Sequence, residues 1–404
     1  MKQVCRVCGT SSRLELVLDL GNQPWGNGFL TKKQIPLEKK YPLRMVQCSS
    51  CSAVQLDYTV PKETMFSNHT YVSGTTNSLR QHFNQLAEHV NNKIQNLGLP
   101  KNILDIGSND GTQLNEYKKL GFITLGVESS HNIAKIANDK NGIPTLPNFF
   151  NEDIAKNTIR TTFSVINASG VFFHLEELHS VCQGVKFLLH SDGFFIIQFI
   201  YLKEMVENLA FDQVYHEHLL YYTIESLSYL LDLHDLEIFD ASKSKIHGGS
   251  LIAFVSHKGR YDKSENLSQL IEEERNSNIN DISRLKEFSI EIENLKNKQT
   301  QLIQKWVQES KKIYGLGAPV KGNTLLNYFG LGTKEIKFLV ERNPLRDTLY
   351  SPGSHIPVVL EKDLKQKPDI YFVLAWNFKD EILSRYADDI KEGIEFFFPI
   401  DPPI

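Results

Sequence analysis

The sequence lacks long hydrophobic runs and any excess of positive charge, and each absence excludes a class of protein. No stretch of its 404 residues approaches the roughly 18 consecutive apolar residues of a membrane-spanning helix. The chain reaches Cys5 and Arg6 before the apolar core of a signal peptide could form, so we expect a cytoplasmic protein without a membrane partner. Lys and Arg total 44 against 48 Asp and Glu, and no basic run could follow a phosphate backbone. Nucleic acid is therefore not an expected partner.

Cysteine is also scarce, but four of the five cysteines form two Cys-x-x-Cys pairs near the N-terminus: Cys5 with Cys8, and Cys48 with Cys51. In a reducing compartment this pattern favours a metal site over disulfides. Zinc suits four thiolates because it takes tetrahedral geometry, and four cysteines leave no open position for catalysis. The sequence predicts a structural zinc ion, with free or redox-active thiols as the alternative. Cys182 lies alone in an apolar helical stretch.

The hydrophobic class makes up 41% of the residues, enough for two or three domains with cores of their own. Apolar residues from Leu79 to Ile94 recur at three- and four-residue steps, as on one side of a packed helix. Strand and helix patterns then alternate, which predicts an α/β fold with a parallel, doubly wound sheet. The expected strands are 103–107, 122–127, 163–167 and 194–199, with helices at 113–119 and 132–139.

A charged stretch separates this α/β pattern from a second one. Leu285, Phe288 and Ile292 keep a helical spacing within it, so we expect long amphipathic helices rather than a disordered linker. A second βα pattern starts at residue 312. The expected domains are a zinc-binding unit over 1–65, an α/β domain over 66–257, a helical connector over 258–310 and a smaller α/β domain over 311–404.

The run from Asp105 to Thr112 lies between a predicted strand and helix and contains Gly107, Asp110 and Gly111. Glycine there lets the backbone turn sharply and approach a ligand at the carboxyl end of a strand. Glu128 closes the next strand, where a carboxylate can accept hydrogen bonds from both ribose hydroxyls of an adenosine. An ordinary tight turn is the alternative interpretation.

The spacing Asp-x-Gly-x-x-x-Gly differs from the Gly-x-Gly-x-x-Gly of dinucleotide binders and resembles motif I of class I methyltransferases. The resemblance implies S-adenosylmethionine as the cofactor. Asn148, Phe149 and Asn167 fall where the later loops of that family contact the adenine and the methionine part, although each could be an ordinary loop or strand-end residue.

The segment from Tyr215 to Leu219 contains His216, Glu217 and His218. Alkylation at carbon needs such groups, because a base must remove a proton next to a ketone and a donor must stabilise the enolate oxygen. Histidine suits the first task and tyrosine the second. The alternative is a polar helix start with a surface histidine pair. The two histidines are two residues apart and would not share a helix face, so a zinc protease site is not expected.

Taken together, the motifs resemble the deoxysugar C-methyltransferases, which methylate C-3 of dTDP-linked 4-keto sugars in antibiotic and cell-surface polysaccharide pathways. The resemblance covers essentially the whole chain. It is carried by the paired Cys-x-x-Cys motifs, Tyr71 and Ser73, 105–111, 172–174, 215–219 and 315–324.

The resemblance implies a role for each matching residue. His218 matches the general base of the family, and Glu217 matches the carboxylate beside it. Tyr215 and Tyr71 match tyrosines around the keto sugar, and His174 matches a further active-site histidine, with a helix-capping role as the alternative.

The chain departs from the family where relatives often carry an acidic residue and a proline after a strand, because it has Gln198 to Tyr201 there. This departure affects the expected sugar contacts. Lys321 belongs to a Gly-rich turn that could bind the nucleotide diphosphate or simply open the second α/β domain. Asn323 and Trp376 are weaker candidates for binding the substrate.

The expected function is transfer of a methyl group from S-adenosylmethionine to C-3 of a nucleotide-linked 4-keto-deoxysugar through a base-generated enolate. One rival is an O- or N-methyltransferase acting on another small metabolite. A rival from another class is a zinc-ribbon interaction protein with a vestigial methyltransferase fold. The sequence leaves the oligomeric state open, a monomer included.

Overall fold

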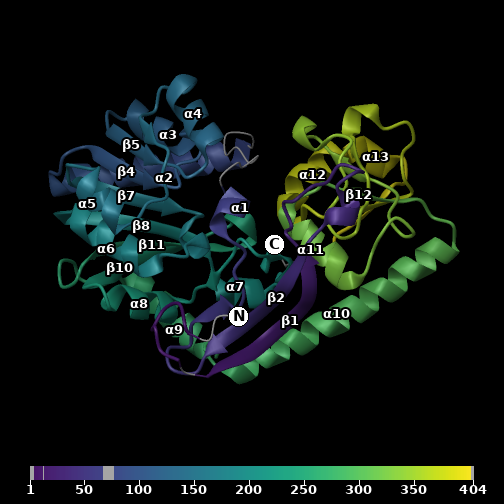
Figure 1. The fold of residues 1–404 in the computed structure, drawn as a ribbon, viewed down its shortest axis with the longest axis horizontal. Coiled ribbons are helices and arrows are strands. Elements are labelled where there is room, and N and C mark those ends of the chain that lie inside the picture. The colour runs from purple at the N-terminus through teal and green to yellow at the C-terminus, as the bar shows by residue number, and fades with distance from the viewer. Residues whose placement is uncertain (1–3, 12, 67–76, 402–404) are drawn as a thin grey trace.

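The computed structural model describes residues 4–11, 13–66 and 77–401, and across these ranges the strands form three sheets (Figure 1). Tyr71 and Ser73, which the sequence analysis singled out, lie outside the described residues. In the described part of the chain, no helix is both long enough and apolar enough to cross a bilayer.

The N-terminal sheet has the order β1-β2-β3-β9. Its main feature is an antiparallel pair of β1 and β2 in which Leu14 lies opposite Cys48, so the chain between the two Cys-x-x-Cys turns folds back on itself. The sequence predicts a zinc-binding unit over 1–65 but not the long strands of this sheet. The bounds are β1 (Leu14–Pro24), η1 (Ile35–Leu37), β2 (Lys40–Cys48), β3 (Val54–Leu56), α1 (Lys62–Phe66) and β9 (Leu220–Tyr221).

The central sheet has the order β10-β11-β8-β7-β4-β5-β6. Strands β4 to β8 run parallel as expected, but β11 is antiparallel to β8, and β10 is antiparallel to β11. The expectation of a wholly parallel sheet was therefore wrong at this edge, because β10 and β11 form a hairpin rather than a βαβ unit. The strands are β4 (Asn102–Ile106), β5 (Ile123–Val127), β6 (Thr145–Leu146), β7 (Phe163–Ser169), β8 (Leu189–Ile200), β10 (Leu236–Ser244) and β11 (Ser250–His257).

Helices cover both faces of the central sheet because its inner strands are apolar on both sides. Val165 and Phe194 pack with α2 and α3 on one face, whereas Ile166 and Phe195 pack with α6 on the other. The helices are α2 (Asn77–Leu97), α3 (Thr112–Lys119), α4 (His131–Asp139), α5 (Glu152–Asn157), η3 (Phe172–His174), α6 (Leu178–Leu188), α7 (Leu202–Glu207), η4 (Phe211–Gln213), α8 (Ile224–Asp232) and η5 (Ile246–Gly248).

Two helices join the central sheet to the C-terminal sheet, as the amphipathic pattern predicted: α9 (Glu265–Asn276) and α10 (Ile282–Gln308). Figure 1 shows α10 running beside β1 toward the C-terminal sheet, and the two elements are in contact. The hairpin and α10 thus connect the two α/β units.

The C-terminal sheet is parallel throughout its described strands, in the order β14-β13-β12-β15-β16. The elements are β12 (Ile313–Leu316), α11 (Val320–Phe329), β13 (Leu339–Glu341), η6 (Pro344–Arg346), β14 (Val358–Leu360), η7 (Glu361–Asp363), β15 (Ile370–Val373), η8 (Trp376–Phe378), α12 (Lys379–Arg385), α13 (Ala387–Lys391) and β16 (Glu395–Phe397). The expected fold class, two α/β units behind a metal-binding unit, is confirmed.

Candidate active site and metal centre

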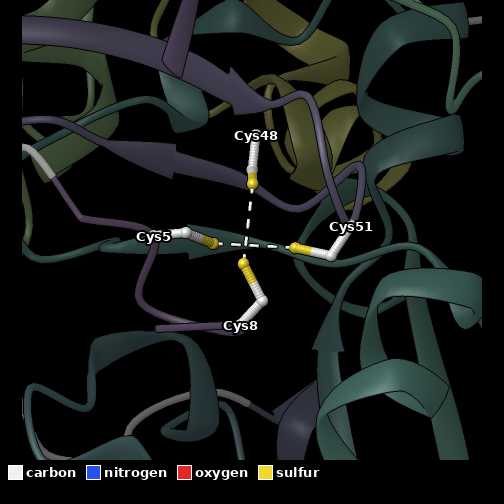
Figure 2. Close-up of side chains that lie close together, drawn as sticks. All are labelled: Cys5, Cys8, Cys48 and Cys51. Atoms are coloured by element: carbon white, nitrogen blue, oxygen red, sulfur yellow. Dashed lines mark hydrogen bonds between the residues drawn. The ribbon is translucent and has the colours of Figure 1, made fainter. Parts of the chain in front are cut away.

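The side chains of Cys5, Cys8, Cys48 and Cys51 point toward one common centre (Figure 2). Their sulfur atoms lie within 4.8 Å of one another, with 3.6 Å between Cys5 and Cys51 and 3.7 Å between Cys8 and Cys48. Four sulfurs at about 2.3 Å from a tetrahedral zinc ion would be separated by roughly 3.8 Å, and a disulfide would need about 2.05 Å. The spacing therefore fits zinc and excludes disulfides in this arrangement.

Backbone N–H groups support two of the thiolates. The Val7 amide donates to Sγ of Cys5 and the Ser50 amide to Sγ of Cys48, each at 3.4 Å. Such N–H donors stabilise negative sulfur and orient it toward a metal. The long strands β1 and β2 bring the second turn back beside the first.

The loop between β4 and α3 needs its glycines. Gly107 and Gly111 have φ angles of +71° and +77°, in the left-handed region that other residues rarely adopt. A Cβ atom at Gly107 would also lie 2.8 Å from Val171. The loop at the carboxyl end of β4 is therefore restricted by backbone conformation and by close packing.

Glu128 follows β5 at the same edge of the sheet and faces this loop. Its Oε2 accepts a hydrogen bond from the Asn109 amide at 2.9 Å, and its Oε1 accepts one from the Ser130 amide at 2.8 Å. Burial raises the pKa of the carboxyl, and these donors oppose the shift. The predicted acidic residue and the predicted loop thus lie together at the edge where α/β sheets bind ligands.

Asp105 in β4 and Asn167 in β7 are buried in the sheet next to this loop rather than exposed on the surface of the loop. Burial raises the pKa of Asp105 to about 7, although Asn167 donates a hydrogen bond to its carboxyl at 2.6 Å. Asn167 is fully buried and also accepts from Ser169. Both residues hold β4 against β7 at this edge, so they support the loop from below.

The other predicted cofactor residues differ in position. The Asp110 carboxylate accepts a hydrogen bond from the Thr112 amide at 3.1 Å, at the start of α3. Asn148 is exposed in the loop after β6. Phe149 lies beside it, with the ammonium of Lys62 4.7 Å from its ring centroid.

His218 lies in a turn before β9, not on a helix, so the interpretation as a polar helix start was wrong. Its Nδ1 is 2.8 Å from the carbonyl oxygen of Gln213, and a carbonyl can only accept, so Nδ1 carries the proton. The neutral ring then has its lone pair on Nε2. This hydrogen bond selects the tautomer that a general base needs.

Aromatic side chains surround the His218 ring, which is 4% exposed. Ring centroids lie 3.8 Å away for Tyr215, 4.6 Å for Phe173 and 5.0 Å for His174. The Nδ1 atom of His174 is 2.5 Å from the carbonyl oxygen of Glu217, which fixes its tautomer in the same way. The structure therefore brings together four of the five residues that the resemblance placed in catalysis, and the fifth, Tyr71, lies outside the described part.

Glu217 is buried beside two residues that the sequence analysis did not select. Nε1 of Trp25, directly after β1, donates to Oε1 of Glu217 at 2.7 Å. Burial raises the pKa of Glu217 to about 7, although this hydrogen bond and the charge of Arg346 oppose the shift. No local pattern around Trp25 indicates that it meets a residue 192 positions away.

His216 points away from this cluster. Its Nε2 is 3.4 Å from the carbonyl oxygen of Tyr41, and burial lowers its pKa to about 4. Within the described ranges, the cysteine cluster is the group of three or more ligands whose atoms lie close enough together to hold a metal ion.

A short series of contacts connects His218 to the loop between β4 and α3, which we call the cofactor loop. Val171 packs against Gly107, and its carbonyl accepts a hydrogen bond from the His174 amide at 2.9 Å. His174 in turn contacts His218. The two predicted centres therefore meet across η3, which directly follows β7.

The three predicted substrate residues lie where the C-terminal unit meets the other two. Lys321 lies over the ring of Trp376, 3.9 Å from its centroid, and Trp376 donates to Asp212 at 2.7 Å. Asn323 donates to the carbonyl of Gly26 at 2.7 Å. Burial lowers the pKa of Lys321 to about 8, and Asp212 opposes this.

Gln198, at the departure from the family pattern, is buried in β8 and lies 2.8 Å from Nε2 of His82 in α2. It serves as a link between sheet and helix in this structure.

Three family models match successive parts of the chain. They are "Putative zinc binding domain" over residues 5–66, "Methyltransferase domain" over 78–241 and "C-methyltransferase C-terminal domain" over 245–401. Together they span the three sheets.

A full-length relative and several solved structures are also similar. The C-methyltransferase NovU of Streptomyces niveus is 30% identical over 406 residues, which cover 99% of this chain and 96% of NovU. An S-adenosylmethionine-dependent methyltransferase from Clostridium acetobutylicum is 15% identical with a TM-score of 0.37, covering 44% of this chain and 92% of its own. The CcbJ methyltransferase from Streptomyces caelestis is 15% identical with a TM-score of 0.34, covering 44% and 90%.

Proposed function

The chain belongs to the C-methyltransferase family, and from this premise we propose that it methylates C-3 of a nucleotide-linked 4-keto-deoxysugar, with dTDP as the nucleotide. The protein is an S-adenosylmethionine-dependent methyltransferase with a zinc-binding domain built on four clustered cysteines. The sugar, the carbon and the mechanism are the proposed part.

The observation that supports this proposal most strongly is the state of His218. Its Nδ1–H donates to the Gln213 carbonyl, so Nε2 is the basic atom of a ring held among aromatic side chains. Removal of a proton from a carbon next to a ketone needs a positioned base of this kind.

The remaining residues have roles that follow from their positions. His218 Nε2 takes the proton from the sugar carbon, and the Tyr215 hydroxyl donates to the oxygen on which the negative charge develops. Glu217, which accepts a hydrogen bond from Trp25, keeps the turn that carries His218 in place. Its buried carboxyl also contacts the sugar. His174 orders the same turn through the Glu217 carbonyl.

Bound S-adenosylmethionine supplies a methyl group that its sulfonium makes electrophilic. The loop at Gly107 and the carboxylate of Glu128 would hold its adenosine part, because both lie at the carboxyl edge of the sheet. The zinc domain has a structural role, since four cysteines close the coordination sphere and β3 pairs with β9 directly after the catalytic turn.

A labelled substrate tests the proposal. The enzyme is incubated with S-adenosylmethionine and a panel of nucleotide-linked 4-keto-6-deoxysugars carrying deuterium at C-3, and products are analysed by mass spectrometry. We expect a product that gains a methyl group and loses the C-3 deuterium. A methylated product that keeps the deuterium would exclude transfer to C-3, and methylation of no member of the panel would exclude this substrate class.

A further inference from the structure

The C-terminal unit contacts residues 212–218, the catalytic segment, on both sides of Gln213. The carbonyl of Gln213 orients the proposed base, His218. Nε1 of Trp376 donates to Oδ2 of Asp212 at 2.7 Å, and Oγ1 of Thr324 donates to the carbonyl of Val214 at 3.1 Å. Between these two residues lies Gln213, whose carbonyl accepts the Nδ1–H of His218. Two hydrogen bonds from helices of the C-terminal unit, α11 and η8, therefore lie on either side of the bond that selects the tautomer.

Both contacts are fully enclosed. Asp212 is 0% exposed, Thr324 2% and Trp376 3%. Water cannot replace a hydrogen bond lost from such a place, so its loss leaves a buried polar atom without a partner. Each of these two hydrogen bonds therefore favours one arrangement of the side chains that form it.

Trp376 is also fixed by its neighbours. A Cβ atom at Gly248, in η5, would lie 2.4 Å from the indole ring, so the ring packs directly on that backbone. Lys321 covers the ring at 3.9 Å from its centroid. The indole is therefore a buried link between units rather than an open platform on which a sugar or base could stack.

The catalytic segment depends on such long-range links because the backbone hydrogen bonds within it only close local turns. Val214 bonds back to Phe211 at 2.9 Å, and His218 bonds back to Tyr215 at 2.9 Å. Successive turns of this kind fix the shape of a short piece of chain but not its place relative to the sheet. Long-range contacts must set that place.

We infer that Thr324 and Trp376 are positioning residues for the base: through Val214 and Asp212 they hold the Gln213 carbonyl where it orients His218. This inference rests on the proposed function, in which His218 removes a carbon-bound proton. It assigns the C-terminal unit a part in catalysis beyond any contact with substrate.

The experiment measures the proton-removal step without methyl transfer. Full-length enzyme is supplied with S-adenosylhomocysteine and a nucleotide-linked 4-keto-6-deoxysugar in deuterium oxide, and NMR follows exchange of the proton at C-3. Thr324→Val removes only the hydroxyl, Thr324→Ser keeps it, and Thr300→Val makes the same change in α10, where the hydroxyl bonds to Lys296 in its own helix. His218→Asn serves as the reference without a base.

For Thr324→Val we expect exchange and kcat to fall together by about tenfold, the effect of one lost buried hydrogen bond, with KM unchanged. Thr324→Ser should recover most of the rate, and Thr300→Val should behave as the wild type. Equal exchange rates in Thr324→Val and wild type would overturn the inference, as would a fall in methylation without a fall in exchange.

Trp376→Phe provides a second, independent test because it removes the indole N–H that Asp212 accepts. We expect slower exchange with little change in KM, whereas a raised KM with normal exchange would mean that Trp376 contacts substrate and would contradict a positioning role. If His218→Asn exchanges as fast as wild type, the proposed function fails. If His218→Asn is inactive while Thr324→Val and Trp376→Phe are normal, only the inference fails.

Discussion

The cofactor loop and the catalytic segment are built in opposite ways. Residues 105–128 form one continuous βαβ stretch, and Glu128 closes it by bonding to Asn109 within the same stretch. The segment 212–218 is held instead by residues from all three units, including Trp25, Thr324 and Trp376. A local site can be recognised from a motif, whereas a site assembled at a junction depends on the whole fold.

The largest effect that separates the two regions is expected from His218→Asn. Without the basic Nε2, methylation should fall by about 10³-fold to 10⁴-fold, near the upper range for loss of a general base. Binding of S-adenosylmethionine should stay within a few-fold of wild type, because the loop at Gly107 is untouched. Initial rates and isothermal titration calorimetry measure the two quantities. Turnover near the wild-type rate would remove His218 from the mechanism.

This contrast explains what could be predicted from the sequence. The strand, glycine turn and carboxylate of the cofactor site were predicted because these residues lie near one another in the sequence. The zinc site was predicted because zinc prefers four thiolates and the sequence has two cysteine pairs. The partners of Glu217 and Asp212 could not be predicted, since Trp25 and Trp376 lie 192 and 164 positions away and meet them only in the folded chain. The antiparallel edge of the central sheet was not predicted for a different reason. The strands of a hairpin and of a βαβ unit have similar composition, so the sequence of β10 and β11 does not show their direction.

Removal of zinc should harm the catalytic segment more than the cofactor loop. Cys48→Ser takes away one of four ligands, and β2, which ends at that cysteine, pairs with β3, which pairs with β9 directly after His218. We expect loss of bound zinc, a lower melting temperature and about a hundredfold loss of activity, comparable to a 1 Å displacement of catalytic groups. Metal analysis and calorimetry follow these changes, with Cys182→Ser as the control because Cys182 lies in α6 and outside the cluster. Equal weakening of cofactor binding would contradict the separation of the two regions.

The buried carboxyl of Glu217 predicts a pH dependence of stability. Its pKa rises from 4.5 to about 7 on folding because of burial. The folded state therefore holds this proton more tightly, and the stabilisation present below pH 4.5 is lost as the pH rises through 7. Glu217→Gln lacks this dependence, so its free energy of unfolding relative to wild type should increase by about 3 kcal/mol between pH 4.5 and 8.

Denaturant unfolding at a series of pH values measures this difference. Glutamine keeps an oxygen that can accept from Trp25, so the comparison isolates the titrating group. A relative stability that does not change with pH would show that Glu217 titrates normally and is not enclosed as the structure has it.

The smallest effect is expected from Gly107→Ala, which tests whether the two regions communicate. The substitution forces a Cβ atom into a left-handed backbone conformation and toward Val171, which lies 2.8 Å away. We expect about tenfold weaker binding of S-adenosylmethionine and a stability loss of roughly 1–2 kcal/mol. Because the Val171 carbonyl bonds to His174, which contacts His218, kcat should also fall by a few-fold at saturating cofactor.

Gly121→Ala is the matched control for this substitution. Gly121 has a φ angle of +84° and no atom within 4 Å of an added Cβ, so alanine there introduces the same backbone strain without the clash. Both variants should lose similar stability, but cofactor affinity and kcat should change only at Gly107. If kcat at saturating cofactor is normal in Gly107→Ala, displacement of Val171 does not reach His218, and the cofactor loop and the catalytic segment are mechanically independent. If Gly121→Ala lowers kcat equally, backbone strain in the βαβ stretch rather than contact with Val171 is what reaches the base.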